Sequence, residues 1–217
     1  MALDDGQGRG IRLGALGWLV LSPVVALLAQ CLYTVFLWTD GAEGLRRLAA
    51  QDAAQVAAVF GEKARIPAAL ASSVYLRIDE MSGETAEPAE LGNGLGGLER
   101  HVRTGLSTYL ETLRLALWLV ALRLGVMLLA LPVLALAAGL GLVDGLAQRY
   151  LRRAGVARES SFLYHRAKHV SVAVLIITCL TYLALPVSLD PLVMLLPAAV
   201  VTGLSLRMAA AYFKKYL

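Results

Sequence analysis

Two histidines have the spacing that comes closest to that of a metal-binding site. His165 and His169 stand four residues apart, which places them on one face of a helix, as in helical zinc motifs. A protein zinc site needs at least three ligands, and the neighbours here are the bases Arg166 and Lys168 rather than an acid. We therefore expect no metal, no cofactor and no catalytic residue, and we predict that the protein is not an enzyme.

The segment around these histidines, residues 144–169, is better suited to binding than to catalysis. It carries six Arg and Lys residues against two acids. One interpretation is a basic loop held by anionic membrane lipids, which attract each base by about 1 kcal/mol. The other is a docking surface for a cytoplasmic protein, because arginine and tyrosine tend to dominate interface energies. The predicted partner-binding residues are Arg152, Arg153, Arg158, Glu159, Tyr164, His165 and Arg166.

The composition of the chain is that of a membrane protein. Of its 217 residues, 58% are apolar and 17% are charged, and the mean hydropathy is +0.66. Soluble domains are about 45–50% apolar and about 25% charged. These values exclude a soluble globular domain, a disordered chain and a protein that coats nucleic acid. Cys31 and Cys179 both lie in apolar runs, so we expect no disulfide framework.

Four apolar stretches predict an all-α integral membrane protein with about four transmembrane helices. A membrane-spanning helix needs roughly 20 apolar residues. The expected spans are 13–38, a long helix over 113–143 that contains the second span, 170–187, and 192–206, the last only 15 residues long. The first stretch continues to Trp38, well past Cys31, and Gln30 does not suit a lipoprotein cleavage site. We therefore expect it to be retained as a helix rather than removed as a signal peptide.

Positive charge predicts how these helices are oriented. The N-terminus (1–12), the loop 144–169 and the tail 207–217 are all basic, and four spans place all three on one side. The positive-inside rule makes that side the cytoplasm. Residues 39–112 then form an extracytoplasmic segment, which holds seven basic and eleven acidic residues.

The extracytoplasmic segment is expected to be a small set of helices. An apolar stripe interrupted by Asp52 predicts a helix over 43–63, and a second helix over 66–78 has Pro67 in its first turn. Glycine-rich residues 82–97 predict a loop, after which a helix continues from Leu98 into the second span. A cap packed on the membrane and a partner-docking domain are both open interpretations of this segment.

Arg123 is the strong base that interrupts the second apolar stretch. An ionisable group inside a membrane is a functional candidate. Leu124–Val143 already supplies 20 apolar residues, which is enough for a span without Arg123. No acid lies deep in another predicted span to pair with it. We therefore expect Arg123 at the outer interface, with its side chain extended toward water.

Small residues recur every fourth position near the end of the second span. Ala137, Gly141 and Gly145 share one helix face and would allow another helix to approach closely. The partner helix is expected to belong either to the same chain or to a second copy in an oligomer.

One string of residues resembles a known family. It runs from Asp144-Gly145-Leu146 to Arg152-Arg153 and continues as RESSFLYHRAK over 158–168. It is similar to membrane proteins of integrating conjugative elements that carry a domain of unknown function, and the resemblance covers nearly the whole chain. It implies a place in bacterial conjugation, since members are encoded among transfer genes, often near the coupling ATPase that delivers DNA to the type IV secretion channel. No catalytic chemistry is attached to the family.

The resemblance and the residues together lead to one expected function. We expect a non-enzymatic accessory protein of the bacterial inner membrane that assists a type IV secretion machine or its coupling ATPase. Membrane lipids and conjugative-transfer proteins are the expected partners, without sequence-specific contact to nucleic acid. Two alternatives remain: a small transporter or channel, and an exclusion or immunity protein. A transporter would need polar side chains deep in several spans, where only modest candidates such as Thr178 and Thr202 occur.

Overall fold

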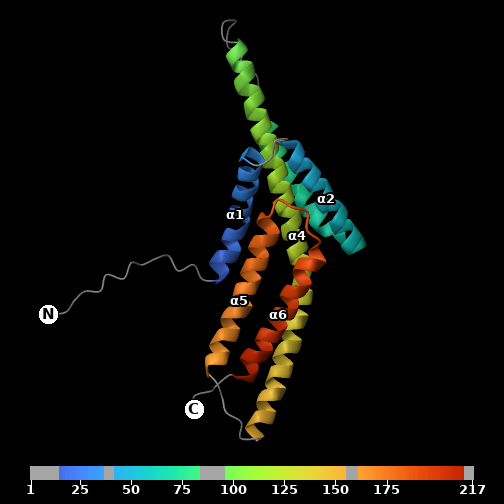
Figure 1. Ribbon diagram of the computed structural model, residues 1–217. Helices are drawn as coiled ribbons and strands as arrows, with labels where there is room; N and C mark the ends of the chain where they lie inside the picture. The colour runs from blue at the N-terminus through green and yellow to red at the C-terminus, as the bar shows by residue number, and fades with distance from the viewer. Residues whose placement is uncertain (1–14, 37–41, 84–95, 155–160, 213–217) are drawn as a thin grey trace, which may run out of the picture.

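The protein is a bundle of helices arranged around one very long helix. The computed structural model describes residues 15–36, 42–83, 96–154 and 161–212, and within these ranges all regular structure is helical. Figure 1 shows α4 running the length of the molecule, with α2 beside its upper part and α5 and α6 beside its lower part. The elements are α1 (Ala15–Phe36), α2 (Ala42–Phe60), the short 3-10 helix η1 (Gly61–Ala64), α3 (Arg65–Gly83), α4 (Gly96–Ala154), α5 (Ser161–Ala184) and α6 (Pro191–Ala211). The predicted all-α class is thereby confirmed.

Helix α4 connects the two ends of the molecule without a break. Its 59 residues extend about 88 Å at 1.5 Å per residue. The hydrocarbon core of a bilayer is about 30 Å thick, so α4 is nearly three times longer than one crossing needs. The helix continues through Pro132. The helix expected to start at Leu98 therefore begins at Gly96 and runs on to Ala154.

Helices α2 and α3 form a hairpin that packs on the upper half of α4. The hairpin turns at Gly61, which has a φ of +53°, a backbone conformation that favours glycine. Pro67 of α3 lies against Gly125 of α4 so closely that a Cβ on that glycine would come within 2.5 Å of the Pro67 Cα. The two helices expected over 43–63 and 66–78 are therefore present, and they cover α4. The loop expected over 82–97 falls mostly outside the described residues.

The last hairpin, α5 and α6, is held by a short turn with a helix cap. The Asp190 side chain accepts a hydrogen bond from the backbone N–H of Leu192 at 2.8 Å, and Pro191 is the first residue of α6. Helix α6 has 21 residues, compared with the 15 expected over 192–206. It is longer because its helical hydrogen bonding continues past Leu206 to Ala211.

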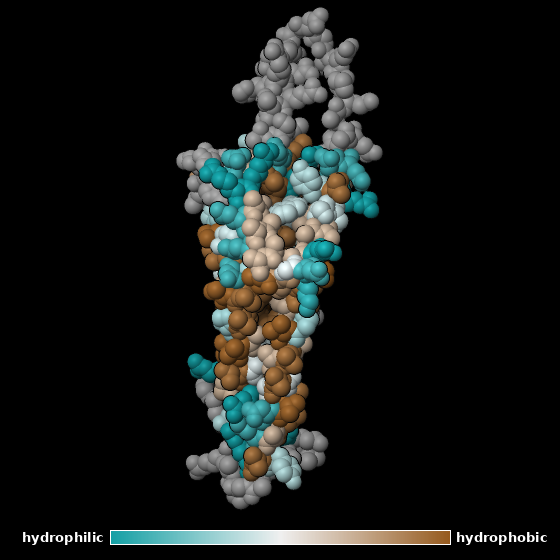
Figure 2. All heavy atoms as spheres, turned by 90° about the vertical axis from the view of Figure 1, so that its right-hand side faces the viewer, coloured by the Kyte–Doolittle hydropathy of each residue, from teal (hydrophilic) through white to brown (hydrophobic). Residues whose placement is uncertain are grey.

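The surface of the lower bundle is apolar. Two helical segments, Tyr109–Arg152 and Pro191–Ala211, are long and apolar enough to cross a membrane, while α1 and α5 contain the shorter apolar segments Val20–Thr34 and His169–Ala184. Figure 2 shows a hydrophobic belt across the middle of the molecule, with hydrophilic side chains above and below it. A belt of this kind indicates association with a membrane.

Candidate functional site

Part of the predicted docking surface can be located at the lower end of the bundle. Arg152 lies in the last turn of α4, and its guanidinium stacks over the Tyr212 ring at 4.0 Å from the centroid. Arg166 lies near the start of α5 and is exposed. Arg158 and Glu159 lie outside the described residues, and so do the side chains of Arg153, Tyr164 and His165.

The described residues bring positive charge from three helices to this one end. Figure 1 shows the end of α4, the start of α5 and the end of α6 lying together. In the part of the chain that the structure describes, the acid at this end is Asp144, which forms an ion pair with Arg207 of α6. The described bases are Arg149, Arg152, Arg166 and Arg207. The lower end is therefore a basic surface built from separate segments of the chain.

The predicted position of the Arg123 side chain is wrong. Its side chain is 1% exposed, so it does not extend to water as expected. Instead, its Nε donates to Asp52 Oδ2 of α2 at 2.7 Å, and the Asp52 side chain is itself only 5% exposed. The sequence analysis considered partner acids only in the other predicted spans, whereas Asp52 lies on α2, within the segment 39–112. Desolvation makes an unpaired buried charge very costly, which explains why the two charges are buried together.

The rest of the Arg123 guanidinium binds the end of α5 and the turn that follows it. The last carbonyl groups of a helix have no partner within the helix and carry its negative dipole end, so they suit a buried cation. The Arg123 carbon Cζ also lies 5.7 Å from the centre of the Tyr182 ring. Its nitrogens donate to the carbonyls of Tyr182 at 2.9 Å, Leu183 at 3.3 Å, Leu185 at 2.6 Å and Val187 at 3.0 Å.

Helix α1 joins the same centre through Gln30. The Gln30 Nε2 donates to the Leu183 carbonyl at 3.0 Å, and that carbonyl also accepts from Arg123. Four elements therefore meet here: α1, α2, α4 and the end of α5. We call the arginine centre the set formed by Arg123, Asp52, Gln30 and the carbonyls that Arg123 binds between Tyr182 and Val187. Arginine stays protonated in proteins, so the centre is suited to holding helices together rather than to moving protons.

A sequence signal for the arginine centre was available. Asp52 occupies the apolar stripe of its helix, between Leu48 and Val56, where a carboxylate must be buried. Arg123 interrupts an apolar run in the same way. Both side chains lie at helix positions that must be buried, and they carry opposite charges. Pairing them offsets part of the free-energy cost of removing each charge from water.

The face of small residues on α4 lies against α6. A Cβ added to Gly141 would overlap the carbonyl oxygen of Gly203, and one added to Gly145 would overlap that of Arg207. A Cβ added to Gly203 would in turn lie 2.8 Å from the Ala137 carbonyl oxygen. Backbone therefore touches backbone along this seam, within one chain.

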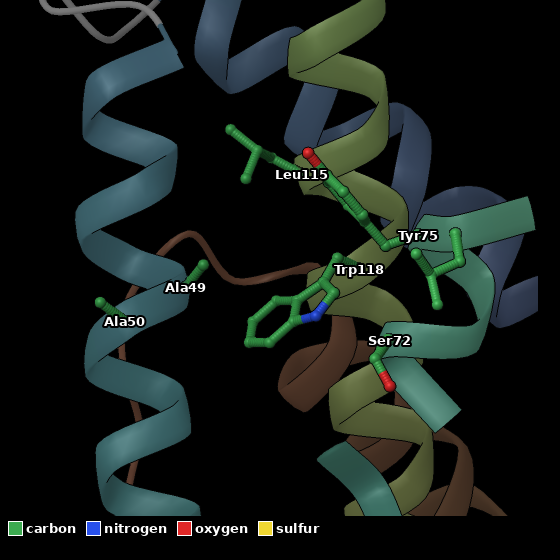
Figure 3. Close-up of a pocket in the computed structure, with 7 residues that line it drawn as sticks. Ala49, Ala50, Ser72, Tyr75, Leu115 and Trp118 are labelled. Carbon is green, nitrogen blue, oxygen red and sulfur yellow. The ribbon is translucent and has the colours of Figure 1, made fainter. Parts of the chain in front are cut away.

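A cleft of about 400 Å³ opens in the upper part of the molecule. Trp118 projects from α4 into the space between α2 and α3 (Figure 3). Ala49 and Ala50 form the α2 side and Ser72 and Tyr75 the α3 side. Beside it, the hydrogen bond from Arg46 to Glu111 raises the pKa of the Arg46 guanidinium above its ordinary value.

Among the described residues, no group of three or more His, Cys, Asp or Glu side chains comes together. The side chain of His165 lies outside them. The expectation that His165 and His169 bind no metal therefore stays a prediction.

Comparison with known families identifies the wider process. No match was found among curated proteins or among solved structures. One family matches residues 18–214, and its description is "IncC plasmid conjugative DNA transfer protein DtrJ-like". The expected link to conjugation is confirmed, although the match names a plasmid family rather than one of integrating elements. The chain belongs to the DtrJ-like family of conjugative DNA transfer proteins.

Proposed function

We propose that the protein is a non-enzymatic inner-membrane accessory of conjugative transfer that crosses the membrane four times. In this proposal its basic lower end, in the cytoplasm, docks a component of the type IV secretion machine such as the coupling ATPase. The observation that carries the proposal is the gathering of bases from α4, α5 and α6 at one end of an apolar bundle. Membership of the DtrJ-like family supports conjugative DNA transfer as the process in which that surface acts.

The geometry also supports different roles for the two ends of the molecule. The arginine centre binds the α2–α3 hairpin to the membrane helices, and α4 extends from that centre to the basic end. The protein would thus present a fixed outer cap and a cytoplasmic docking surface on one rigid helix. The cap interpretation of residues 39–112 is favoured because α2 and α3 bury their apolar faces on α4.

We predict the topology from the positions of the basic segments. A reporter that is active only outside the cytoplasm should work when fused after Glu87 and should fail when fused after Arg158 or Leu217. The 21-residue α6 supports the inner location of the C-terminus, because it extends about 30 Å. Activity of the Leu217 fusion would mean that α6 does not cross, and the four-span proposal would be wrong.

We predict that docking depends on residue type and not only on charge. In a donor cell, Tyr164→Ala, Glu159→Ala and Arg158→Lys should each lower transfer frequency by about tenfold or more, the effect expected of an interface hot spot. Lysine keeps the charge of Arg158 but loses the planar fork that binds carboxylates in two places. Transfer frequency is measured in matings, with membrane accumulation of each variant checked by immunoblot.

A lipid-held loop gives a different pattern from a docking surface. In that case Tyr164→Ala and Arg158→Lys should be nearly silent, because lipid attraction needs only the number of positive charges. Removal of several bases together should then be required for any loss. Normal transfer by all three single variants would contradict docking at this segment and leave the lipid interpretation in place.

A further inference from the structure

The tip of the α2–α3 hairpin carries exposed bases beside an exposed apolar side chain. We define the tip as residues 61–66, which comprise η1 and the first two residues of α3. Lys63 and Arg65 are exposed, and neither forms an ion pair with a residue that the structure describes. Ile66 is 58% exposed. Glu62 is the acid of the tip, so two bases and one acid give it a net charge of +1.

Contacts with α4 fix the level of the tip along the molecule. Pro67, the residue after the tip, lies against Gly125, where an added Cβ would come within 2.5 Å of the Pro67 Cα. Gly125 is the second residue of the apolar stretch Leu124–Val143. Farther along α3, Asp79 pairs with Arg114 of α4, so α3 runs away from the apolar stretch as it leaves the tip. The tip is therefore the end of the hairpin nearest to the proposed membrane.

Contacts with α6 indicate the same level. Val56 of α2 and Ala71 of α3 belong to one buried cluster with Leu195, the fifth residue of α6. The tip connects α2 to α3 beyond these two residues. Figure 1 shows the lower end of the α2–α3 hairpin level with the upper end of α6. With the membrane placed as proposed above, the tip lies at its outer boundary.

The residue types of the tip suit a phospholipid headgroup. At the boundary of a bilayer, an apolar side chain can enter the interface while neighbouring bases stay in the headgroup layer. Lysine binds phosphate as a compact charge, and arginine binds it with a planar fork of donors. A partner protein is the other class of ligand for such a patch. The level of the tip favours lipid, because headgroups surround any exposed side chain at that depth.

We propose that the tip of the α2–α3 hairpin binds the phosphate of an anionic phospholipid in the outer leaflet. Lys63 and Arg65 bind the phosphate, and Ile66 enters the interface beside them. The site rests on the membrane placement and orientation proposed above, but not on the role in conjugation. Because the hairpin packs on α4, the contact would hold the upper part of that helix at a fixed depth relative to the membrane.

Photocrosslinking from position 66 tests this contact. Ile66 is replaced by the photoreactive residue p-benzoylphenylalanine in the full-length protein, which is reconstituted into vesicles with equal amounts of anionic phosphatidylglycerol and zwitterionic phosphatidylethanolamine. Irradiation joins the probe to the molecule that it touches, and mass spectrometry identifies the adduct. We expect phospholipid adducts in which phosphatidylglycerol is enriched about fivefold, the factor that corresponds to about 1 kcal/mol for one net charge.

The same probe at two other positions calibrates the experiment. Leu136 is exposed on α4 and lies 11 residues after Gly125, about 17 Å farther along the helix. A probe there should form lipid adducts without a headgroup preference, because it touches acyl chains. Met81 is exposed on α3 and lies 15 residues after Ile66, about 22 Å away from the membrane. A probe at Met81 should form no lipid adduct.

Charge variants separate phosphate binding from simple closeness to the bilayer. Lys63→Gln/Arg65→Gln should keep the lipid adducts at position 66 but remove the enrichment of phosphatidylglycerol. Arg77→Gln is the matched control, because Arg77 is an exposed base on the same helix, 12 residues after Arg65. It should leave the enrichment unchanged. Gel filtration checks that every variant elutes as the wild type does.

Three results would overturn the contact at the tip. They are no lipid adduct at position 66 when position 136 gives one, equal amounts of the two phospholipids at position 66, and an enrichment that survives in the double variant. A protein adduct in place of lipid, after irradiation of donor cells, would assign the tip to a partner protein instead. Absence of lipid adducts at position 136 as well would contradict the membrane placement itself, so the two failures are distinguishable.

Discussion

Replacing Asp52 with leucine is expected to lower the free energy of unfolding by about 3–5 kcal/mol, the largest single effect that we predict. The substitution leaves the Arg123 charge buried at 1% exposure with carbonyl groups but without its carboxylate. The measurement is chemical unfolding of the detergent-solubilised protein. The double variant Asp52→Leu/Arg123→Met should regain part of the loss, because neither charge is then left buried alone.

A second aspartate–arginine pair provides the matched control. Asp79 contacts Arg114 at 2.8 Å, close to the distance in the arginine centre, but its side chain is 56% exposed. Water screens such a pair, so Asp79→Leu should cost less than about 1 kcal/mol. Equal losses for Asp52→Leu and Asp79→Leu, or strictly additive losses in the double variant, would show that Arg123 and Asp52 are not coupled.

Adding one methyl group to Gly141 should destabilise the protein by about 1–3 kcal/mol, the usual cost of overpacking. The Cβ of Gly141→Ala would overlap the Gly203 carbonyl oxygen, which belongs to the backbone and cannot rotate away. Helices α4 and α6 would have to move apart along the seam. The same unfolding measurement applies to this variant.

Gly139→Ala is the matched control for Gly141→Ala. It lies on the same helix two residues away, and nothing lies within 4 Å of a Cβ built there. Gly139→Ala should therefore be neutral or stabilising by up to about 1 kcal/mol, because alanine favours helix more than glycine does. A loss of stability in Gly139→Ala as large as that in Gly141→Ala would mean that helix packing does not explain the effect.

Local patterns in the sequence were enough to predict the helices. The apolar stripe of 43–63 and Pro67 in a first turn each depend on a few neighbouring residues, and α2 and α3 are present. The predicted fourth span, 192–206, stops before Arg207, whereas the helix α6 extends to Ala211. In the structure that arginine pairs with Asp144, and the helix continues past it.

The arginine centre was missed because it depends on distant contacts. Arg123 and Asp52 are 71 residues apart, and they meet only when the α2–α3 hairpin folds back on α4. Its other partners are backbone carbonyls, which every residue possesses and which no sequence pattern distinguishes. A search for side-chain partners within the spans therefore could not find them.

The partners in the arginine centre are made at different times during synthesis. Asp52 leaves the ribosome before Arg123, whereas the carbonyls of Tyr182 to Val187 are made later. Among the described residues that pair with or hydrogen-bond to the guanidinium, Asp52 is therefore the partner already made when Arg123 is added. Synthesis of α5 and of the turn that follows it supplies the remaining acceptors, and a chain that stops before α5 lacks all four of these carbonyls.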